Sequence, residues 1–452
     1  MSNLFEYQNR IAFSDDIEGL ETFLEGIWSN RERNSYFSEG SESDLGSQGF
    51  LDIFHKTKEL KSKKFVGVIH FNGSRLNLLP KIFYDSNREY KNEEVSNIQN
   101  HILWWLSYCN KIKFPNYQSA LGSSKSDFFE VLIYLFSKYT RELLGSSIYQ
   151  RYEEENREIT YMKGRLDVNE YISENLSKGK WQNLNCSFDS FVIDNEFNRI
   201  VKYVTTQLHS VTSNPENKRN LSEILFVLDD VTYIQASAEQ CERINFNPMF
   251  STFEIVRDYC KLFLAHSVSF DYKNDLKLFA FLLPMEYIFE DFIFGFINKE
   301  LPSVFAKAQR SDIFLDESEA FNLKPDLFLK TEFNSLIADT KYKMVYSDEN
   351  DSKKGISQND LYQMLAYAVR FKTDEIILFY PNTIKNVQLQ SHEILIKDAL
   401  ADNKEISIRA YQLPIINNDL LYGNLESGVS LNELFKETSL RLKEKLDEIL
   451  LN

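Results

Sequence analysis

Hydrophobic residues recur at helical spacing in several long stretches of the chain. Residues 128–144 repeat apolar side chains every three or four positions, and residues 285–297, which follow Pro284, do so with greater regularity. This periodicity is typical of amphipathic helices that pack one face against a core. The same pattern predicts further helices at residues 101–109, 197–204, 251–265, 360–371 and 431–451.

Shorter apolar runs predict strands. Residues 66–71 and 75–83 flank Asn72-Gly73, a dipeptide that favours a two-residue hairpin turn because both positions tolerate positive φ. Pro80 lies within the second run and indicates either an edge strand or the end of a strand. Further strands are expected at residues 375–380 and 407–413.

Polar segments separate these elements. The clearest loop is the acidic and serine-rich stretch at residues 38–47, and the main domain boundary is expected near Asn247, where a polar loop precedes a predicted helix. Asp194 and Asn198 accompany the helix predicted at residues 197–204. By their pattern these two residues are a helix cap and a packed polar residue rather than a site.

The most informative stretch is residues 321–343, where two short apolar runs flank a polar turn and each run carries a carboxylate. If the turn centres between residues 332 and 333, antiparallel partners have numbers that sum to 665. Asp326 then lies directly opposite Asp339, and directly opposed Cβ atoms on one face are about 5 Å apart. The pattern therefore predicts a pair of close carboxylates.

A lysine is expected beside this pair. Side chains alternate along a strand, so Lys341 projects from the same face as Asp339 while Thr340 points away. Two close carboxylates repel each other unless a cation lies between them, and oxygen ligands suit Mg²⁺, which keeps water and phosphate in its remaining positions. Lys341 could then orient, or help to deprotonate, a water on the metal. This chemistry is what hydrolysis of a phosphodiester requires.

A structural salt-bridge network on a half-exposed hairpin would explain the same residues. Against that alternative, the apolar residues 336–338 run directly into Asp339. A strand that is buried on both faces seldom ends in a charge without a reason. The spacing alone leaves both interpretations open.

Three more polar residues belong to helices that should flank the hairpin. At about 100° per residue, Glu286 and Glu290 fall on the margin of the apolar stripe in residues 285–297, so both could reach the edge of the hairpin. Gln363 lies opposite the apolar stripe of its own helix, so periodicity alone places it at the surface. The order helix, hairpin, helix, strand is typical of a small mixed sheet with flanking helices.

Composition narrows the class of protein. The chain has 452 residues, too many for one ordinary core, and a net charge of −16, so any contact with DNA requires a local basic groove. The four cysteines show neither metal-binding nor disulfide spacing. A basic, apolar leader and any apolar run of 18 or more residues are absent from the sequence, so a cytosolic protein without a membrane span is expected. The chain has no GxxxxGK[ST] phosphate-binding loop, so it cannot itself be a nucleotide-driven motor of that kind.

Taken together, the motifs resemble a known family. Pro325-Asp326 and, after twelve intervening residues, Asp339-Thr340-Lys341 resemble the PD-(D/E)xK nuclease core. More specifically, the chain resembles the McrC family, the nuclease subunits of McrBC-type restriction systems. The stretches that carry the resemblance are residues 79–82, 163–166, 194–199, 289–290, 323–329, 338–343 and 360–368.

The resemblance implies a multidomain protein of the α/β and α+β classes. Residues 1–247 would form a mixed β and helical region that binds an AAA+ GTPase ring of the McrB kind and stimulates its GTP hydrolysis. Residues 248–452 would form a PD-(D/E)xK-type nuclease domain, a mixed sheet flanked by helices, that cuts double-stranded DNA.

The resemblance also implies roles for individual residues. Asp326 and Asp339 would hold Mg²⁺, and the carbonyl of Thr340 would be a possible third ligand. Lys341 would orient the attacking water and stabilise charge on the phosphate. Two further residues join this catalytic set: Glu290 would bind the metal directly or through water, and Gln363 would position the nucleophile or the DNA backbone.

Two alternatives remain open from sequence. One is a stand-alone nuclease of the same fold, against which the long region ahead of the catalytic residues argues. The other is a non-catalytic activator or adaptor of a ring NTPase whose nuclease site has decayed. The presence of Asp326, Asp339 and Lys341 argues against decay, because a decayed site is expected to lose at least one of the three.

Overall fold

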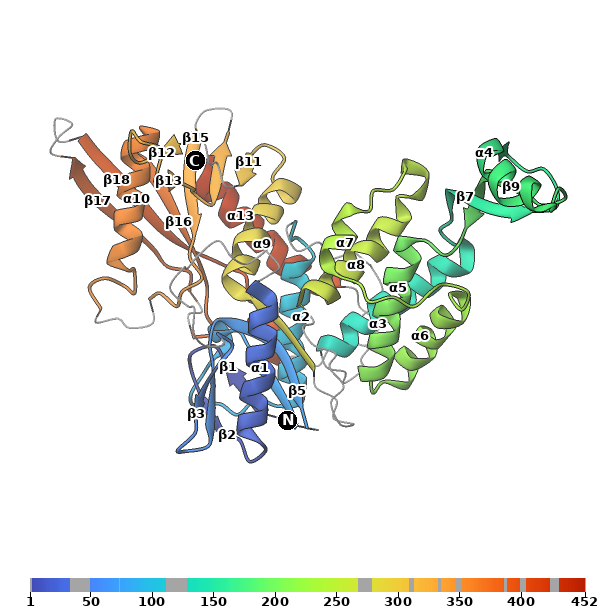
Figure 1. The fold of residues 1–452 in the computed structure, drawn as a ribbon. Coiled ribbons are helices and arrows are strands. Elements are labelled where there is room, and N and C mark those ends of the chain that lie inside the picture. Colours follow the sequence, from blue (N-terminus) through green and yellow to red (C-terminus); the bar gives the residue numbers. More distant parts are fainter. Residues whose placement is uncertain are drawn as a thin grey trace. The chain divides into compact units, whose positions relative to one another are not determined.

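The chain forms two compact units in the computed structural model (Figure 1): unit 1 comprises Met1–Leu132 and Ala265–Asn452, and unit 2 comprises Ile133–Leu264. The described residues are 2–32, 49–72, 74–110, 128–266, 279–308, 313–331, 335–346, 351–385, 388–398, 404–422 and 431–451. The loop predicted at residues 38–47 and the hairpin turn at residues 332–334 lie outside them.

This grouping differs from the expected division at residue 247, which falls inside unit 2. The reason is strand pairing. β10 (Phe279–Pro284) returns to the N-terminal part of the chain and pairs antiparallel with β5 (Phe65–Phe71). Sequence periodicity cannot reveal a pairing between strands so far apart. Whether residues 1–247 bind the partner stays a prediction.

The N-terminal sheet of unit 1 has the strand order β1-β6-β5-β10. β1 (Ser2–Phe5) runs parallel to β6 (Ser74–Leu79), and β6 forms the predicted hairpin with β5 around Asn72, whose φ is positive. β6 ends immediately before Pro80, as one of the two predicted options had it. It is nevertheless an interior strand, because β1 pairs with its other side.

Smaller elements complete this part of unit 1. A second sheet has the order β2-β4-β3, and its hydrophobic face joins α1 and the N-terminal sheet in one core. The bounds are β2 (Arg10–Ala12), β3 (Leu51–Phe54), β4 (Glu59–Ser62), α1 (Ile17–Glu32), η1 (Lys81–Phe83) and α2 (Asn92–Leu106). The helix predicted at residues 101–109 thus begins earlier, because the polar turn at residues 92–94 is part of α2.

A six-stranded mixed sheet follows, with the order β11-β14-β15-β16-β18-β17. β15, β16 and β18 are parallel, and the remaining pairs are antiparallel. In the β14-β15 hairpin Leu327 pairs with Ala338 and Lys330 with Ser335, so the predicted register sum of 665 is confirmed. The bounds are β11 (Phe305–Ala308), β14 (Leu327–Lys330), β15 (Ser335–Thr340), β16 (Glu375–Pro381), β17 (Ser391–Asp398) and β18 (Lys404–Leu413).

Helices flank this sheet, as predicted (Figure 1). α10 (Gln358–Phe371) packs Met364, Tyr367 and Ala368 into the core formed by β15, β16 and β18, while α9 (Met285–Glu300) contacts β11 and β15. The helix predicted at residues 431–451 is interrupted at Phe435, whose ring stacks on Trp104 with centroids 4.7 Å apart. The remaining elements are β12 (Ile313–Phe314), β13 (Asn322–Leu323), α11 (Asn418–Tyr422), α12 (Leu431–Leu434) and α13 (Lys436–Leu451).

Unit 2 is a bundle of helices with a projecting arm. Phe136 contacts the rings of Tyr259 and Phe263 in the bundle core, with centroids 6.0 and 5.6 Å apart. The helices are α3 (Phe128–Ser146), which begins in unit 1, α5 (Glu196–Val211), α6 (Pro215–Val227), α7 (Ala238–Arg243), α8 (Thr252–His266) and the short η4 (Pro248–Phe250).

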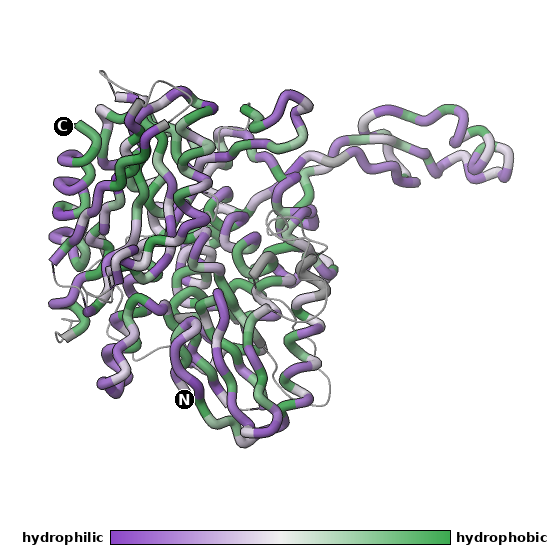
Figure 2. The backbone as a smooth tube through the Cα atoms, turned by 90° about the vertical axis from the view of Figure 1, so that its left-hand side faces the viewer, coloured by the Kyte–Doolittle hydropathy of each residue, from purple (hydrophilic) through white to green (hydrophobic). Residues whose placement is uncertain are grey.

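The arm, residues 151–192, extends away from the helices of its own unit (Figures 1 and 2). β7 and β8 pair on either side of β9, and short helical turns cap the far end. The bounds are β7 (Arg151–Ile159), β8 (Arg165–Leu166), α4 (Val168–Glu170), η2 (Tyr171–Asn175), η3 (Leu176–Lys178) and β9 (Leu184–Val192). Among the described helices, none combines the length and apolar character that a membrane span needs.

Candidate functional site

The candidate site lies where β14 begins and β15 ends in the six-stranded sheet. Leu336, Ile337 and Ala338 of β15 are buried, and Asp339, which follows them, is only 1% exposed. The confirmed register brings the residue before β14, Asp326, to the same end of the hairpin. Asp339 is therefore buried because it directly follows an apolar run, residues 336–338, that packs in the core.

Asp326 is held by the end of the neighbouring strand. Its Oδ2 accepts hydrogen bonds from the backbone N–H and from the hydroxyl of Thr340, both at 2.8 Å. The expectation that Thr340 points away from the acids is therefore wrong. Asp326 precedes β14 and lies outside the ladder, so its carboxylate is free to reach across to Thr340 rather than following the strict alternation of a paired strand.

Asp339 is the less satisfied of the two acids. Apart from the charged contact between its Oδ2 and Lys341 Nζ at 2.5 Å, neither carboxylate oxygen accepts a hydrogen bond from a described side chain. Buried carboxylates normally have several hydrogen-bond donors, because an unsatisfied charge is costly in a medium of low polarity. Asp339 therefore retains the capacity to bind a cation.

Lys341 connects the acids to α10. Its Nζ donates to Gln363 Oε1 at 3.0 Å while it pairs with Asp339. Gln363 is exposed, as its place in the helix predicted, but its side chain reaches the lysine nevertheless. Gln363 therefore lies on the surface of α10, as its spacing predicts. This surface of the helix faces Lys341 and the two aspartates.

The acids resist ionisation together. Burial, followed by the charges of Asp339 and Glu290, raises the pKa of Asp326 despite its bonds to Thr340. Burial likewise raises the pKa of Asp339, and the nearby Lys341 offsets only part of that effect. A bound cation would remove this penalty, because it would stabilise both charged carboxylates at once.

Lys341 behaves in the opposite way. Burial lowers its pKa, but the charges of Asp339, Asp326 and Asp360 and the hydrogen bond to Asp339 outweigh burial, and the net shift is upward. The lysine therefore remains protonated at neutral pH. A protonated lysine can donate hydrogen bonds and stabilise negative charge, but it cannot accept a proton.

Glu290 of α9 is the third acidic group that acts on the site, since its charge raises the pKa of both aspartates. Among the described residues, however, no three acidic, histidine or cysteine side chains converge closely enough to form a metal cluster by themselves. Asp326 and Asp339 could hold a divalent ion of the kind that takes few protein ligands and completes its shell with water and phosphate.

Tyr367 is a site residue that the sequence analysis missed. Its hydroxyl accepts a hydrogen bond from Gln363 Nε2 at 2.8 Å and donates one to the carbonyl of Lys324 at 3.0 Å. A continuous chain of hydrogen bonds therefore runs from Lys341 through Gln363 and Tyr367 to the segment that precedes Asp326. The available signal was the spacing of Gln363 and Tyr367, which places them on one helix face.

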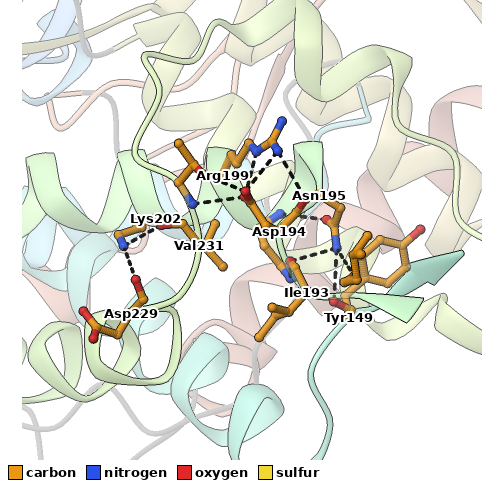
Figure 3. A network of polar contacts seen from close by, with 11 residues as sticks. Tyr149, Ile193, Asp194, Asn195, Arg199, Lys202, Asp229 and Val231 are labelled. Atoms are coloured by element: carbon orange, nitrogen blue, oxygen red, sulfur yellow. Dashed lines mark hydrogen bonds and ion pairs between the residues drawn. The ribbon is translucent and has the colours of Figure 1, made fainter. Parts of the chain in front are cut away.

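A second polar network surrounds Asp194 in unit 2 (Figure 3). Asp194 accepts hydrogen bonds from Arg199 Nε at 2.7 Å and from the hydroxyl of Thr232 at 2.6 Å. Arg199 Nη2 and the backbone N–H of Thr232 add bonds of 3.1 and 3.0 Å. Lys202 donates to the carbonyls of Asp229 and Val231 nearby. These contacts fix the segment 229–232 against α5.

The Asp194 network is structural rather than ligand-binding. Both carboxylate oxygens are occupied, and the bond to Arg199 is the largest of the effects that hold the pKa of Asp194 well below its usual range. The predicted helix cap is displaced by one residue: Asn195, not Asp194, accepts the bond from the backbone N–H of Asn198. Asn198 is fully buried and donates to the carbonyls of Tyr149 and Ile193, so its prediction as a packed polar residue is confirmed.

Comparison with known proteins adds to this geometry. A family model described as "McrBC 5-methylcytosine restriction system component" matches residues 60–381. A chain in the "refined half-complex from tetradecameric assembly of Thermococcus gammatolerans McrB AAA+ hexamers with bound McrC" is similar to this chain, with a TM-score of 0.69 and 18% identity over 99% of each chain.

A second similar chain comes from the "cryo-EM structure of the Thermococcus gammatolerans McrBC complex", with a TM-score of 0.51 and 20% identity over 66% of this chain and 88% of that one. Likeness at these identities shows a common fold. Among curated proteins, no sequence matches this chain.

Proposed function

Because the chain belongs to the family of McrBC 5-methylcytosine restriction system components, we propose that it is the Mg²⁺-dependent DNA endonuclease subunit of such a system, acting with an AAA+ GTPase ring of the McrB kind. The observation that carries the nuclease proposal is the state of Asp339. This carboxylate is buried beside a second carboxylate, and the protonated Lys341 is its one side-chain partner among the described residues.

The donor set fits Mg²⁺. In this proposal Asp326 and Asp339 hold the ion, the carbonyl of Thr340 is a further ligand, and Glu290 binds it directly or through water. The side-chain hydroxyl and backbone N–H of Thr340 keep Asp326 in place for this role. When bound, Mg²⁺ would supply a Lewis acid that polarises the phosphodiester.

Lys341 acts in this proposal as a hydrogen-bond donor rather than as a base. Its raised pKa keeps it protonated, so it can orient the attacking water and stabilise negative charge on the phosphate. Gln363 fixes the ammonium group from the side of α10, and Tyr367 in turn fixes the orientation of the Gln363 amide. The three residues thus place one positive charge beside the acids.

The local basic groove expected for an acidic protein is proposed to lie at this end of the sheet. Lys341 and Lys343 follow β15, and the backbone N–H of Tyr346 donates to the carbonyl of Lys354 at 2.9 Å. This contact brings the segment with Lys353 and Lys354 back to Tyr346, six residues after the end of β15. In the proposal these four lysines line the path of the DNA phosphates and offset the net charge of −16 locally.

The arm is the proposed contact with the ring. Its far end exposes large hydrophobic side chains, among them Met162 and Trp181, each 68% exposed. Side chains of this kind are typical of interaction surfaces when they gather in one region. The similar structure is one of McrB AAA+ hexamers with bound McrC. The structural similarity covers 99% of this chain, so it includes the arm.

The test is cleavage of plasmid DNA, methylated and unmethylated, by the full chain with its McrB-like partner, GTP and Mg²⁺. The comparison is between wild type and Lys341→Ala. Cleavage in the complete mixture, at least about 10²-fold slower in the variant because a transition-state charge partner is lost, would support the proposal.

Other results of this assay would separate the alternatives. Cleavage that needs neither the partner nor GTP would favour a stand-alone nuclease. GTPase stimulation without cleavage of either plasmid would favour the non-catalytic activator. Equal cleavage by wild type and Lys341→Ala would show that Asp326, Asp339 and Lys341 are not the active site.

A further inference from the structure

Lys341 begins a tight turn whose central residue, Tyr342, is buried. Lys343 N–H donates to the carbonyl of Lys341 at 2.8 Å, the hydrogen bond of a three-residue γ-turn centred on Tyr342. We call residues 341–343 the lysine turn. Its two lysines reach Asp339 and Asp360, while Tyr342 between them is 3% exposed. Whatever fixes Tyr342 therefore fixes the backbone from which Lys341 projects.

Tyr342 packs against residues from distant parts of unit 1. Its ring lies 6.0 Å from the ring of Phe289 in α9, and Lys81 Nζ lies over the ring face at 4.6 Å from the centroid, a favourable cation–π distance. The hydroxyl is buried beside the carboxyl group of Glu6. Burial, followed by the charge of Glu6 and the hydrogen bond to it, raises the pKa of Tyr342 well above its usual value.

Glu6 is an unusual residue to find at this position. It follows β1, is 1% exposed, and accepts the backbone N–H of Lys81 through Oε2 at 3.1 Å. The groups that face it are Lys81 of η1, Tyr342 of the lysine turn and Glu286 of α9. Burial, opposed by Lys81 and reinforced by Glu286, raises the pKa of Glu6 to about 7. A carboxylate that is this costly to bury and is only partly compensated gives the fold little stability.

We propose that Glu6 is a positioning residue of the nuclease site, whose carboxylate holds Lys81 over Tyr342 and thereby fixes the lysine turn. The proposal rests on the proposed function, because it takes Lys341 to act in cleavage. It gives a role to the segment 79–82, whose sequence resembles the family and which no part of the catalytic geometry explains. In this proposal a residue that follows the first strand of the N-terminal sheet helps to position Lys341 for cleavage.

The test compares wild type with Glu6→Gln, which keeps the shape and the acceptor for the Lys81 N–H but never ionises. Plasmid cleavage by the full chain with its partner, GTP and Mg²⁺ is measured from pH 6 to pH 8, with kcat and KM determined separately. At pH 8 we expect kcat to fall about tenfold in the variant, because a charge-assisted contact is lost, while KM and the stimulation of GTP hydrolysis are unchanged.

At pH 6 the two proteins should converge, since Glu6 of the wild type is then largely protonated and resembles glutamine. The ratio of the two kcat values cancels the pH dependence of the chemistry itself. The matched control is Glu94→Gln, which removes the charge of a partly buried carboxylate of unit 1 that pairs with Arg88. Glu94 is not among the groups that act on Glu6 or Tyr342. This variant should cleave like wild type at both pH values.

Lys341→Ala, measured in parallel, separates the two proposals. If it is inactive while Glu6→Gln matches wild type at pH 8, the positioning role is wrong and the proposed active site stands. If it cleaves like wild type, the proposed function fails. A kcat that falls by one constant factor at every pH, with a lower Tm, would show that Glu6 is only structural and would overturn the inference.

Lys81→Met provides a second variant if Glu6→Gln does not fold. It keeps the aliphatic stem and removes the charge over Tyr342. We expect about a tenfold lower kcat than wild type at pH 8 and a much smaller difference at pH 6, because the wild type has then lost the charge of Glu6 that holds Lys81 over Tyr342. Wild-type kcat in Lys81→Met at pH 8 would contradict the inference.

Discussion

Asp339 and Asp194 each lie near a basic residue in a motif of the chain, yet their surroundings differ. Asp194 in unit 2 accepts bonds from Arg199 and Thr232 to both of its oxygens, and its pKa is lowered. Asp339 in unit 1 has Lys341 as its one side-chain partner among the described residues, and its pKa is raised.

The difference shows that a basic neighbour alone does not determine whether a carboxylate is structural or can bind a ligand. The number and geometry of its hydrogen-bond donors determine this. A carboxylate whose oxygens are all occupied contributes to the fold and has nothing left to offer a ligand. A buried carboxylate with few donors is destabilised in its charged form until a cation or a proton binds. We therefore propose a ligand-binding role for Asp339, whereas Asp194 contributes to the fold.

The largest effect that would sharpen this comparison concerns pH and Mg²⁺. Because the pKa values of both Asp326 and Asp339 are raised, the proposed metal site would hold a proton at neutral pH when no metal is bound, and Mg²⁺ would have to displace it. Affinity for Mg²⁺ should therefore rise with pH, by about tenfold for each pH unit below the raised pKa. Calorimetric titration with MgCl₂ at pH 6, 7 and 8, in buffers of different ionisation enthalpy, measures both affinity and proton release.

Asp339→Asn is the control for that titration, since it removes one of the coupled acids and should leave weak binding with little pH dependence. Equal affinity of the wild type for Mg²⁺ at pH 6 and pH 8 would contradict the contrast drawn between Asp339 and Asp194. It would mean that the two carboxylates are already ionised without a metal.

The next effect is on stability. Asp194→Ala removes the carboxylate that accepts hydrogen bonds from Arg199 and Thr232. We expect the free energy of unfolding of unit 2 to fall by about 2 kcal/mol, a moderate value because Asp194 and Arg199 are about one third exposed. Urea denaturation followed by circular dichroism would measure it. No loss of stability would show that the network in Figure 3 does not hold the segment 229–232.

The smallest effect is expected from Tyr367→Phe, which removes one hydroxyl from the chain of hydrogen bonds between Gln363 and Lys324. Lys341 keeps its bond to Gln363, so kcat for cleavage should fall only about fivefold, the size of one lost neutral hydrogen bond. Steady-state cleavage measures this, with Tyr362→Phe on the exposed side of α10 as control. A loss as large as that of Lys341→Ala would mean that Tyr367 itself contacts the substrate.

Local patterns were enough to predict the hairpin and its register. Period-two alternation and the polar turn placed Asp326 opposite Asp339, and β14 pairs with β15 in the predicted register. The helix-surface position of Gln363 was also predicted, although its contact with Lys341 was not. These features depend on residues that are near one another in sequence or on one element, so periodicity determines them.

Features that depend on distant segments could not be predicted in this way. The pairing of β10 with β5 joins residues about 210 positions apart, and the contact of Glu6 with Lys81 and Tyr342 requires three separate elements. The contact of Thr340 with Asp326 was not predicted, because strand alternation was assumed for Asp326, which precedes β14 and lies outside the β14–β15 ladder. The assigned catalytic and metal-binding roles of Asp326, Asp339, Lys341, Glu290 and Gln363 remain predictions.

The most direct measurement is plasmid cleavage by Asp339→Asn and Asp194→Asn side by side with wild type, in the complete mixture with partner, GTP and Mg²⁺, well below the Tm of each protein. We expect Asp339→Asn to cleave at least about 10³-fold more slowly while still stimulating GTP hydrolysis, and Asp194→Asn to cleave at nearly the wild-type rate. Undiminished cleavage by Asp339→Asn, or loss of cleavage and GTPase stimulation together, would contradict the assignment of this carboxylate to a nuclease site.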